Sequence, residues 1–286
     1  MTFESKKDVL DWYEAQPSSV TPEFLSSINW HEVRQYPFDA RLVPVLFYMR
    51  DVESLTDMYY RELRRTPTGR DPHISKFMAR WGEEELVHGQ LLDRFLNELG
   101  YETDERWYER VRSSVGRFYK AHTYAITTLT NLVGRRFTGT HMIFGAINEM
   151  TTGQAYRRLM EKANHPVLTQ ILRAILREES LHTNFYSRVA RLELEKQPIS
   201  QKLARFVIDH FWEPVGGSAL GYVRSNYTIA QLFGDDEGRR VIDSAVSKRL
   251  NSFPGFSGVA AINRAAEKSI QAGKIIHQME ALSAVL

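Results

Sequence analysis

Four glutamates and two histidines lie at positions where helical spacing calls for apolar side chains. Glu85 and His88 fall on one stripe and Glu179 and His182 on another, each pair in a Glu-x-x-His arrangement. The first stripe consists of Phe77, Trp81, Glu85, His88, Leu92, Phe95 and Leu99, and the second of Leu168, Leu172, Ile175, Glu179, His182, Tyr186 and Val189. Steps of three and four residues follow one face of an α-helix, so these polar side chains are predicted to point into a core.

Two further helical segments each bring one carboxylate to an apolar stripe. These stripes are Leu42, Leu46, Met49, Glu53, Thr56 and Tyr60, and Met142, Gly145, Glu149, Thr152, Tyr156 and Leu159. A buried carboxylate is unfavourable unless it is paired, protonated or bound to a metal. Each residue alone could be a surface ion pair or a hydrogen-bonded core histidine. The six together favour a shared metal site.

The arrangement of these residues repeats along the chain. Glu53 precedes Glu85 by 32 residues, and Glu149 precedes Glu179 by 30, as expected of two similar helix pairs packed around one axis. Bundles that hold two iron ions use one Glu from each of two helices and a Glu-x-x-His from each of the other two. Oxygen and imidazole ligands suit iron, with manganese an option at one site. The chain has no cysteine, which excludes thiolate metal sites, iron–sulfur clusters and disulfides.

The elements that would position these residues are helices. Apolar residues recur three and four apart along nearly the whole chain, and no alternating strand pattern is evident. We expect one helical segment between about Pro44 and Pro67, and others over 72–99, 104–133, 137–163, 166–197, 199–212, 218–233, 235–251 and 258–285. The prediction is an all-α protein with a four-helix-bundle core and additional flanking helices. It forms a single domain over residues 1–286, with the metal-binding core at about 40–195 and a helical C-terminal extension at about 199–286.

Composition limits the class of protein. The hydrophobic fraction of 43% and charged fraction of 25% are ordinary for a globular protein. The net charge of +2, with basic residues in short pairs, does not indicate nucleic-acid binding. The first 20 residues lack the apolar core of a signal peptide, and no stretch approaches ~20 uninterrupted apolar residues. We therefore expect a cytoplasmic protein without a membrane span, which receives any redox electrons from another protein.

Four segments resemble the soluble acyl-carrier-protein desaturase family, a branch of the ferritin-like di-iron carboxylate oxidases. They are residues 53–59 (ESLTDMY), 81–92 (WGEEELVHGQLL), 148–152 (NEMTT) and 178–182 (EESLH), and the resemblance covers about 42–193. The second is the most specific, because a Trp, a Glu-Glu-x-x-His-Gly and a Leu-Leu recur there in the family. Inside the two Glu-x-x-His motifs the chain departs from the family, since Leu86-Val87 and Ser180-Leu181 replace the usual polar or basic residues.

The resemblance implies a ferritin-like fold and a division of the six residues between two iron ions. Glu85 and Glu179 would bridge the ions, Glu53 and His88 would complete one site, and Glu149 and His182 the other. Thr152 matches a family threonine beside the oxygen-binding face, where it would relay a proton; the alternative is a small core residue. Glu84 and Glu178 each precede a ligand glutamate and would accept the free ring N–H of a ligand histidine; the alternative is a surface charge.

The function implied by the resemblance is an O2-dependent di-iron oxidase or desaturase that attacks an unactivated C–H bond of a fatty-acyl chain. Its partners would be an external electron donor such as a ferredoxin, an acyl carrier protein and a second copy of the chain in a homodimer. Two alternatives stay open. One is a related hydroxylase or N-oxygenase acting on a small metabolite, which an inward-turned His141 or His210 would favour; the other is a non-catalytic metal-binding bundle. Candidates for an apolar channel are Tyr59, Phe77, Met142, Phe144 and Tyr156, although a plain core position is the favoured interpretation of each.

Overall fold

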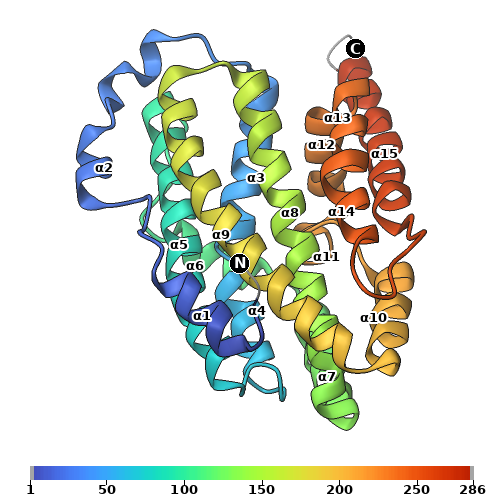
Figure 1. Cartoon of the computed structure of the whole chain (residues 1–286). Helices are drawn as coiled ribbons and strands as arrows, with labels where there is room; N and C mark the ends of the chain where they lie inside the picture. Colours follow the sequence, from blue (N-terminus) through green and yellow to red (C-terminus); the bar gives the residue numbers. More distant parts are fainter. Residues whose placement is uncertain (1–2, 284–286) are drawn as a thin grey trace.

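The computed structural model describes the backbone of residues 3–283 and the side chains of residues 3–276. Within that range every regular element is a helix (Figure 1), which confirms the all-α prediction. The core of the bundle consists of α3 (Val43–Glu53), α5 (Pro72–Leu99), α8 (Thr138–Ala163) and α9 (Pro166–Lys196). In Figure 1 these four helices run alongside one another, with α3 packed on α5 and α8 packed on α9.

Local sequence signals set the ends of the long helices. The carboxylate of Asp71 accepts hydrogen bonds from the backbone N–H groups of His73 and Ile74, and Pro72 occupies the first turn of α5, where its missing N–H costs nothing. Gly100 ends the helix with a φ of 101°, a left-handed conformation that suits glycine. Pro166 begins α9 in the same way as Pro72 begins α5. Both predicted starts and the predicted end at Gly100 are confirmed.

Three segments predicted as continuous helices are interrupted. The segment 218–233 divides at Gly221, whose φ is 99°, and the other two break beside hydroxyl side chains. The first of these two breaks between α3 and α4 (Thr56–Leu63), where the hydroxyls of Ser54 and Thr56 donate to the carbonyls of Asp51 and Glu53. The segment 104–133 divides into α6 (Trp107–Ser114) and α7 (Arg117–Val133), again after serine hydroxyls that bond to backbone carbonyls. Such side-chain bonds compete with helical ones. Hydrophobic periodicity alone does not reveal this competition, and for that reason both of these predictions of a continuous helix were wrong.

Shorter elements surround the core on both sides. The N-terminal ones are α1 (Lys6–Glu14), α2 (Pro22–Ser27) and two 3-10 turns (Trp30–Gln35 and Ala40–Leu42), and a third such turn (Gly134–Phe137) joins α7 to α8. The C-terminal ones are α10 (Pro198–Phe211), α11 (Gly217–Leu220), α12 (Tyr222–Phe233), α13 (Asp236–Val241), a π-helical turn (Ile242–Ser247), α14 (Lys248–Asn251) and α15 (Ala261–Ser283). The N-terminal helices were not anticipated from the sequence.

The C-terminal helices form a layer against the core. Helix α12 packs on α15 and also contacts α3 and α8. The buried guanidinium of Arg158 on α8 donates to the carboxylate of Asp235, 2.5 Å away, and to the carbonyl of Leu232, so a charged link joins the two layers. Among residues 3–283, none of the helices combines the length and the apolar character that crossing a bilayer would require.

Candidate metal centre

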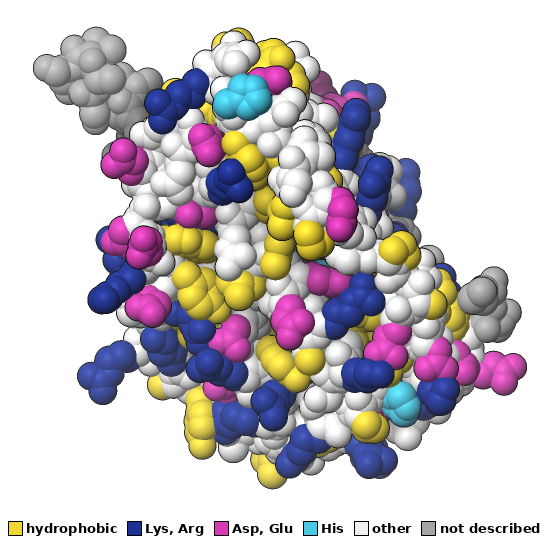
Figure 2. Space-filling view, turned by 90° about the vertical axis from the view of Figure 1, so that its left-hand side faces the viewer, with side chains coloured by type: hydrophobic (Ala, Val, Ile, Leu, Met, Phe, Trp, Pro, Cys, Tyr) yellow, Lys and Arg dark blue, Asp and Glu magenta, His cyan; other side chains and the backbone are white. Residues whose placement is uncertain are grey.

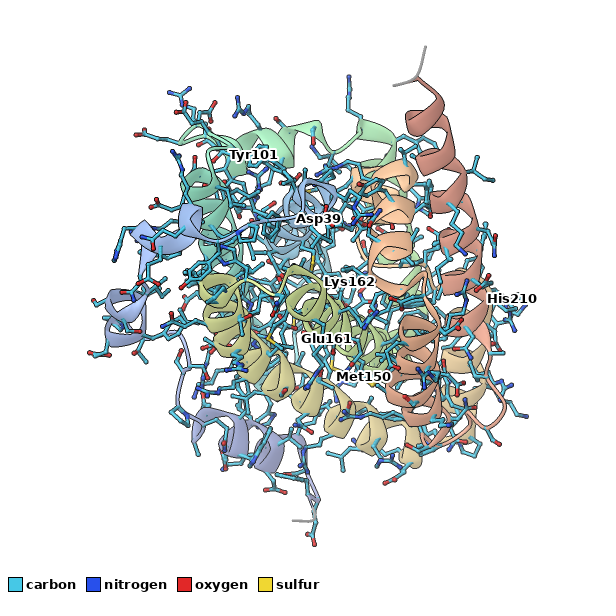
Figure 3. All side chains as sticks on the ribbon, turned by 90° about the horizontal axis from the view of Figure 1, so that it is seen from above. Asp39, Tyr101, Met150, Glu161, Lys162 and His210 are labelled. Atoms are coloured by element: carbon cyan, nitrogen blue, oxygen red, sulfur yellow. The ribbon has the colours of Figure 1, made fainter. Side chains whose placement is uncertain are left out.

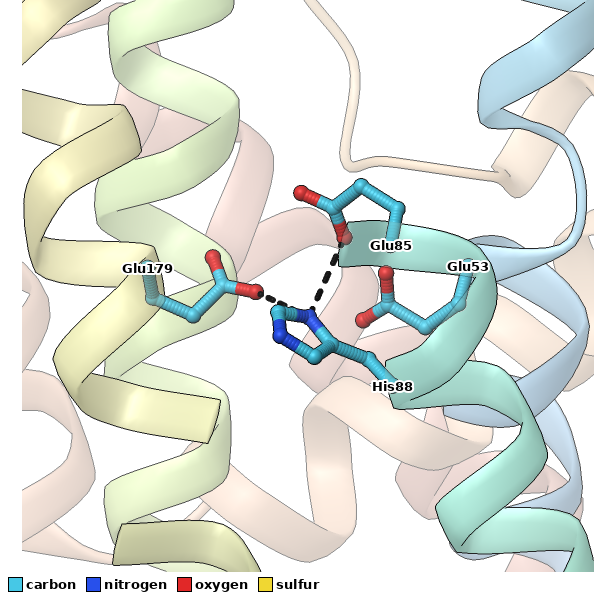
Figure 4. A group of neighbouring side chains, drawn as sticks. All are labelled: Glu53, Glu85, His88 and Glu179. Atoms are coloured by element: carbon cyan, nitrogen blue, oxygen red, sulfur yellow. Dashed lines mark ion pairs between the residues drawn. The ribbon is translucent and has the colours of Figure 1, made fainter. Parts of the chain in front are cut away.

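The six predicted residues converge inside the core bundle. Their side chains lie on α3, α5, α8 and α9, and each residue is at most 6% exposed. One ligand atom from each of Glu53, Glu85, His88 and Glu179, a carboxylate oxygen or an imidazole nitrogen, lies within 4.8 Å of the other three (Figure 4). The same holds for Glu85, Glu149, Glu179 and His182. Two four-residue groups therefore share Glu85 and Glu179.

Each histidine is held by the glutamate that precedes the ligand candidate on the opposite helix. Nε2 of His88 lies 2.8 Å from Glu178, and Nε2 of His182 lies 2.8 Å from Glu84. Because a carboxylate only accepts, each ring donates its Nε2–H outward. The Nδ1 atoms consequently face inward, 3.4 Å from Glu179 for His88 and 3.1 Å from Glu85 for His182.

The inward-facing atoms have the properties that a bound cation requires. Among the described residues, Nδ1 of His88, Nδ1 of His182 and both carboxylate oxygens of Glu179 are buried without a hydrogen-bond partner. Buried polar atoms without partners are unfavourable, and nitrogen and oxygen donors of this kind suit iron or manganese. The residues present therefore fit a pair of metal ions.

The electrostatics of the cluster point the same way. Burial raises the pKa of Glu53 and of Glu149 well above its usual range, and the neighbouring carboxylates Glu85 and Glu179 raise it further. Burial opposes protonation of His88, yet the surrounding carboxylates raise its pKa well above the usual value. Without metal, Glu53 and Glu149 thus favour their protonated forms, and the carboxylates around the histidines draw protons onto the imidazoles, because the site lacks compensating positive charge.

The N-terminal segment supports both outer glutamates, a role that the sequence did not indicate. One oxygen of Glu178 accepts from the Ser18 hydroxyl at 2.6 Å and from the backbone N–H of Ser19 at 2.7 Å and of Val20 at 3.0 Å. Glu84 accepts from the Tyr13 hydroxyl at 2.6 Å, and from Arg80 at 2.8 Å. Arg80 lies four residues before Glu84 on the same helix, but the donors from residues 13–20 lie far from their acceptors in sequence, and no spacing pattern connects them.

Two aromatic side chains donate directly to ligand candidates. The indole N–H of Trp81 lies 3.1 Å from a carboxylate oxygen of Glu149, and the hydroxyl of Tyr156 donates to Glu53. Tyr156 was expected as a channel candidate; instead it holds a carboxylate from within the core. Its position on the same stripe as Glu149 was the only signal available from the sequence.

A cavity of about 750 Å³ opens onto the cluster. Glu53, Glu85, Glu149 and Glu179 form part of its wall, and the predicted residues Thr152, Tyr59 and Phe144 also line it. Further out it is lined by α4, α7 and the segment 211–219. Three predicted channel residues lie outside the wall, among them Tyr156, which bonds to Glu53. Phe77 stacks on Phe185 with ring centroids 3.7 Å apart, and Met142 is fully buried in the core.

Neither additional histidine joins the cluster. Nδ1 of His141 lies 2.8 Å from the hydroxyl of Thr68, and burial lowers its pKa to about 3. His210 is exposed and bonds to the carbonyl of Phe206; Figure 3 shows it at the outer edge of the molecule. The feature that would have favoured an N-oxygenase is thus not present in either residue.

Comparison with known proteins gives one family match and two similar relatives. Residues 50–190 match the rubrerythrin family model, and this range contains all six clustered residues. Two curated Mycobacterium tuberculosis proteins, from strains CDC 1551 / Oshkosh and ATCC 25618 / H37Rv, are both named "Putative acyl-(acyl-carrier-protein) desaturase DesA1". Each is 26% identical to this chain over 206 residues, which cover 69% of this chain and 57% of the relative. The chain therefore spans little more than half the length of these relatives. The matches confirm the resemblance predicted from the motifs and the ferritin-like fold: residues 50–190, just under half of the chain, are similar to the rubrerythrin family, and both relatives carry a desaturase name.

Proposed function

We propose that this protein is a di-iron oxidase that uses O2 to desaturate an acyl chain. The proposal rests mainly on one observation: a cavity of about 750 Å³ reaches a six-residue cluster of the di-iron type. A bundle that only stored or buried metal would not need a cavity of this size against its carboxylates. The desaturase name of the two relatives supports an acyl substrate.

The ligand assignment follows the two groups of atoms. Glu85 and Glu179 belong to both groups and would be shared by the two ions, Glu53 and His88 would complete one site, and Glu149 and His182 would complete the other. Two iron ions held there supply O2 activation and the oxidising power needed for C–H cleavage. Glu84 and Glu178 keep both imidazoles oriented with Nδ1 inward.

The cavity wall supplies the remaining functions. Leu55, Met58 and Phe144 offer apolar surface to a hydrocarbon chain and limit water near the cluster. The hydroxyl-bearing Thr152 lies in the same wall as Glu53 and Glu149 and relays a proton there. Desaturation removes two hydrogens from adjacent carbons, while O2 takes up these together with two external electrons and two protons to form two water molecules. A ferredoxin-like donor provides the electrons, and an acyl carrier protein presents the chain.

The test begins with metal and continues to product. Anaerobic addition of Fe2+ should load about two irons per chain, measured by elemental analysis. Loaded protein then receives acyl-carrier-protein-bound substrates, a ferredoxin with its reductase, and O2, and mass spectrometry follows the acyl chain. The expected product has lost two hydrogens; gain of one oxygen atom would instead indicate a hydroxylase.

Matched variants separate the site from general damage. Glu85→Ala/Glu179→Ala should lose iron and product, whereas Glu83→Ala, on the exposed face of the same helix, should keep both. Folded wild-type protein that fails to bind iron would refute the metal centre. Iron-loaded protein that consumes no O2 with any acyl chain would refute the oxidase while leaving the metal centre intact.

A further inference from the structure

Helix α7 presents a polar face to the rest of the protein. The residues turned inward are Tyr119, Thr123, Thr127 and Thr130, at helical spacing. The Thr127 hydroxyl lies 2.9 Å from the carboxylate of Glu62 and 3.3 Å from the guanidinium of Arg65, both at the end of α4. The contact between α7 and the protein is therefore made largely by hydroxyls and charges. A surface helix usually has the opposite polarity, with its apolar stripe on the core.

The outward face of α7 is apolar. Phe118 is 85% exposed, Leu129 60% and Leu132 83%, and Ile126 and Val133 are also exposed. Ile126, Leu129 and Leu132 are three residues apart, Val133 is four residues after Leu129, and Phe118 lies eleven residues, or about three turns, before Leu129; these spacings place them along one side of the helix. Large side chains this exposed, and contiguous, mark a surface that binds something apolar.

The chain segment that contains α7 carries charge of one sign. The sequence from Arg110 to Asn148 contains no Asp or Glu. Exposed basic residues lie near both ends of α7: Arg117 and Lys120 at its start, and Arg135 and Arg136 just beyond its end. Helix α7 lies at the lower end of the molecule in Figure 1, and Figure 2 shows basic side chains beside hydrophobic ones at that end.

We propose that α7 docks the protein on an anionic lipid surface. An apolar helix face with basic residues at its borders is the arrangement by which helices lie in the headgroup region of anionic membranes. A second copy is a poor occupant, because antiparallel pairing about a two-fold axis would bring Arg117 and Lys120 of one chain against Arg135 and Arg136 of the other. Like charges would then border the interface on both sides.

Helix α7 contributes to both the docking face and the cavity wall, through different residues. Tyr119, Lys120, Thr123 and Tyr124 of α7 line the cavity, and Phe118, Leu129 and Leu132 do not. Docking through α7 would therefore bring the outer part of the cavity close to the lipid surface, which is a source of apolar chains. The lipid contact itself requires no metal, so it stands or falls separately from the oxidase proposal.

The test is sedimentation of the full chain with lipid vesicles. Vesicles of phosphatidylcholine alone are compared with vesicles that also contain phosphatidylglycerol, at low and high salt. We expect binding to the anionic vesicles, weakened by salt because exposed charges are screened. Phe118→Ser and Leu132→Ser should each weaken it about tenfold, since each removes one inserted apolar side chain. Arg135→Glu/Arg136→Glu should weaken it as well.

Ile275→Ser is the matched control, because Ile275 on α15 is 57% exposed, and α15 ends at the top of the molecule in Figure 1 whereas α7 lies at the bottom. It should bind anionic vesicles like the wild type. Circular dichroism verifies that each variant is folded. The proposal is overturned if the wild type ignores anionic vesicles, or if the α7 variants bind as well as Ile275→Ser. It is also overturned if Leu132→Ser turns a dimer into a monomer, which would assign the face to a second copy.

Discussion

At the scale of single residues, the two histidines have matching partners with different supports. Glu178 and Glu84 both accept the Nε2–H of a histidine at 2.8 Å. Glu178 is fixed by two backbone N–H groups and a serine hydroxyl, whereas Glu84 is fixed by a tyrosine hydroxyl and an arginine. Backbone donors hold their position more firmly than an arginine side chain. The two metal positions are therefore related in their ligands and unequal in their surroundings.

Replacing Glu178 tests the support of His88. Glu178→Gln keeps the size of the side chain but removes the negative charge that makes the imidazole a strong ligand. Iron affinity should fall about 10- to 100-fold at one of the two positions, measured by anaerobic Fe2+ titration. Glu83→Gln, an exposed charge on α5, should leave the titration unchanged. Equal affinities in the two variants would show that Glu178 does not act on the metal position.

The metal-free histidines also predict a dependence on pH. Although burial opposes their charged form, neighbouring carboxylates raise the pKa of His88 and of His182 well above 6.5. A raised histidine pKa stabilises the metal-free fold below the unfolded pKa of about 6.5, and this contribution is lost as pH rises through the folded pKa. Metal binding at Nδ1 must displace these protons.

Iron affinity should therefore increase with pH between about 6 and 8. Each binding event should also release protons, detectable with an indicator dye in weak buffer. Lys7, an exposed group outside the cluster, has its pKa raised by Asp11 and serves as a contrast: Lys7→Ala should not alter proton release. Binding that is insensitive to pH would mean that the histidines are already neutral before metal arrives.

At the scale of elements, α8 depends on a glycine to approach α9. A Cβ at Gly145 would lie 2.3 Å from Cε1 of Tyr186, a fully buried side chain of α9. Tyr186 in turn packs edge-on against Trp81, which donates to Glu149. Close packing of the two helices at this glycine thus positions the aromatic layer next to the cluster.

Replacing glycine by alanine at two positions of α8 should change the free energy of unfolding in opposite directions. Gly145→Ala forces Tyr186 to move and should destabilise the protein by roughly 1–3 kcal/mol. Gly153→Ala meets nothing within 4 Å and should stabilise it by roughly 0.5–1 kcal/mol, because alanine restricts the unfolded chain. Urea unfolding of metal-free protein measures both. Stabilisation by Gly145→Ala would refute the close approach.

The sequence predicted those helices whose apolar residues recur at regular spacing along one face. The stripes around Glu85 and Glu179 placed four of the six clustered residues on the correct faces, and Asp71-Pro72 marked the start of α5. It did not predict contacts made across long separations, such as Tyr13 to Glu84. Neither did it predict breaks set by local hydroxyl bonds, as at Ser54. The long-range contacts depend on tertiary geometry, and the breaks depend on side-chain hydroxyls that compete for backbone carbonyls. Hydrophobic periodicity contains no information on either.

At the scale of the whole molecule, segments before and after the four core helices help to enclose the cluster and its cavity. Residues 13–20 donate to the outer glutamates, and the segment 211–219 forms part of the cavity wall. The hydroxyl of Tyr48 on α3 donates to the carbonyl of Val215 at 2.5 Å and ties that segment to the core. The C-terminal helices are thus more than an appendage, since the cavity is incomplete without the segment that leads into them.

Because the ligand candidates come from α3, α5, α8 and α9, metal should stabilise the entire fold. A ligand that binds only the folded state adds about 2.7 kcal/mol when its concentration is 100 times its dissociation constant. For a chain of this size, each kcal/mol moves the thermal midpoint by roughly 2–4 °C. Calorimetry of Fe2+-loaded protein before and after anaerobic chelation should therefore show a fall of several degrees in the thermal midpoint.

Glu85→Ala/Glu179→Ala should show the same midpoint with and without Fe2+, since both shared carboxylates are gone, while Glu83→Ala should behave like the wild type. If chelation left the wild-type midpoint unchanged although iron had been bound, the four helices would have to be held without any contribution from the metal, and the buried carboxylates would need another source of compensation.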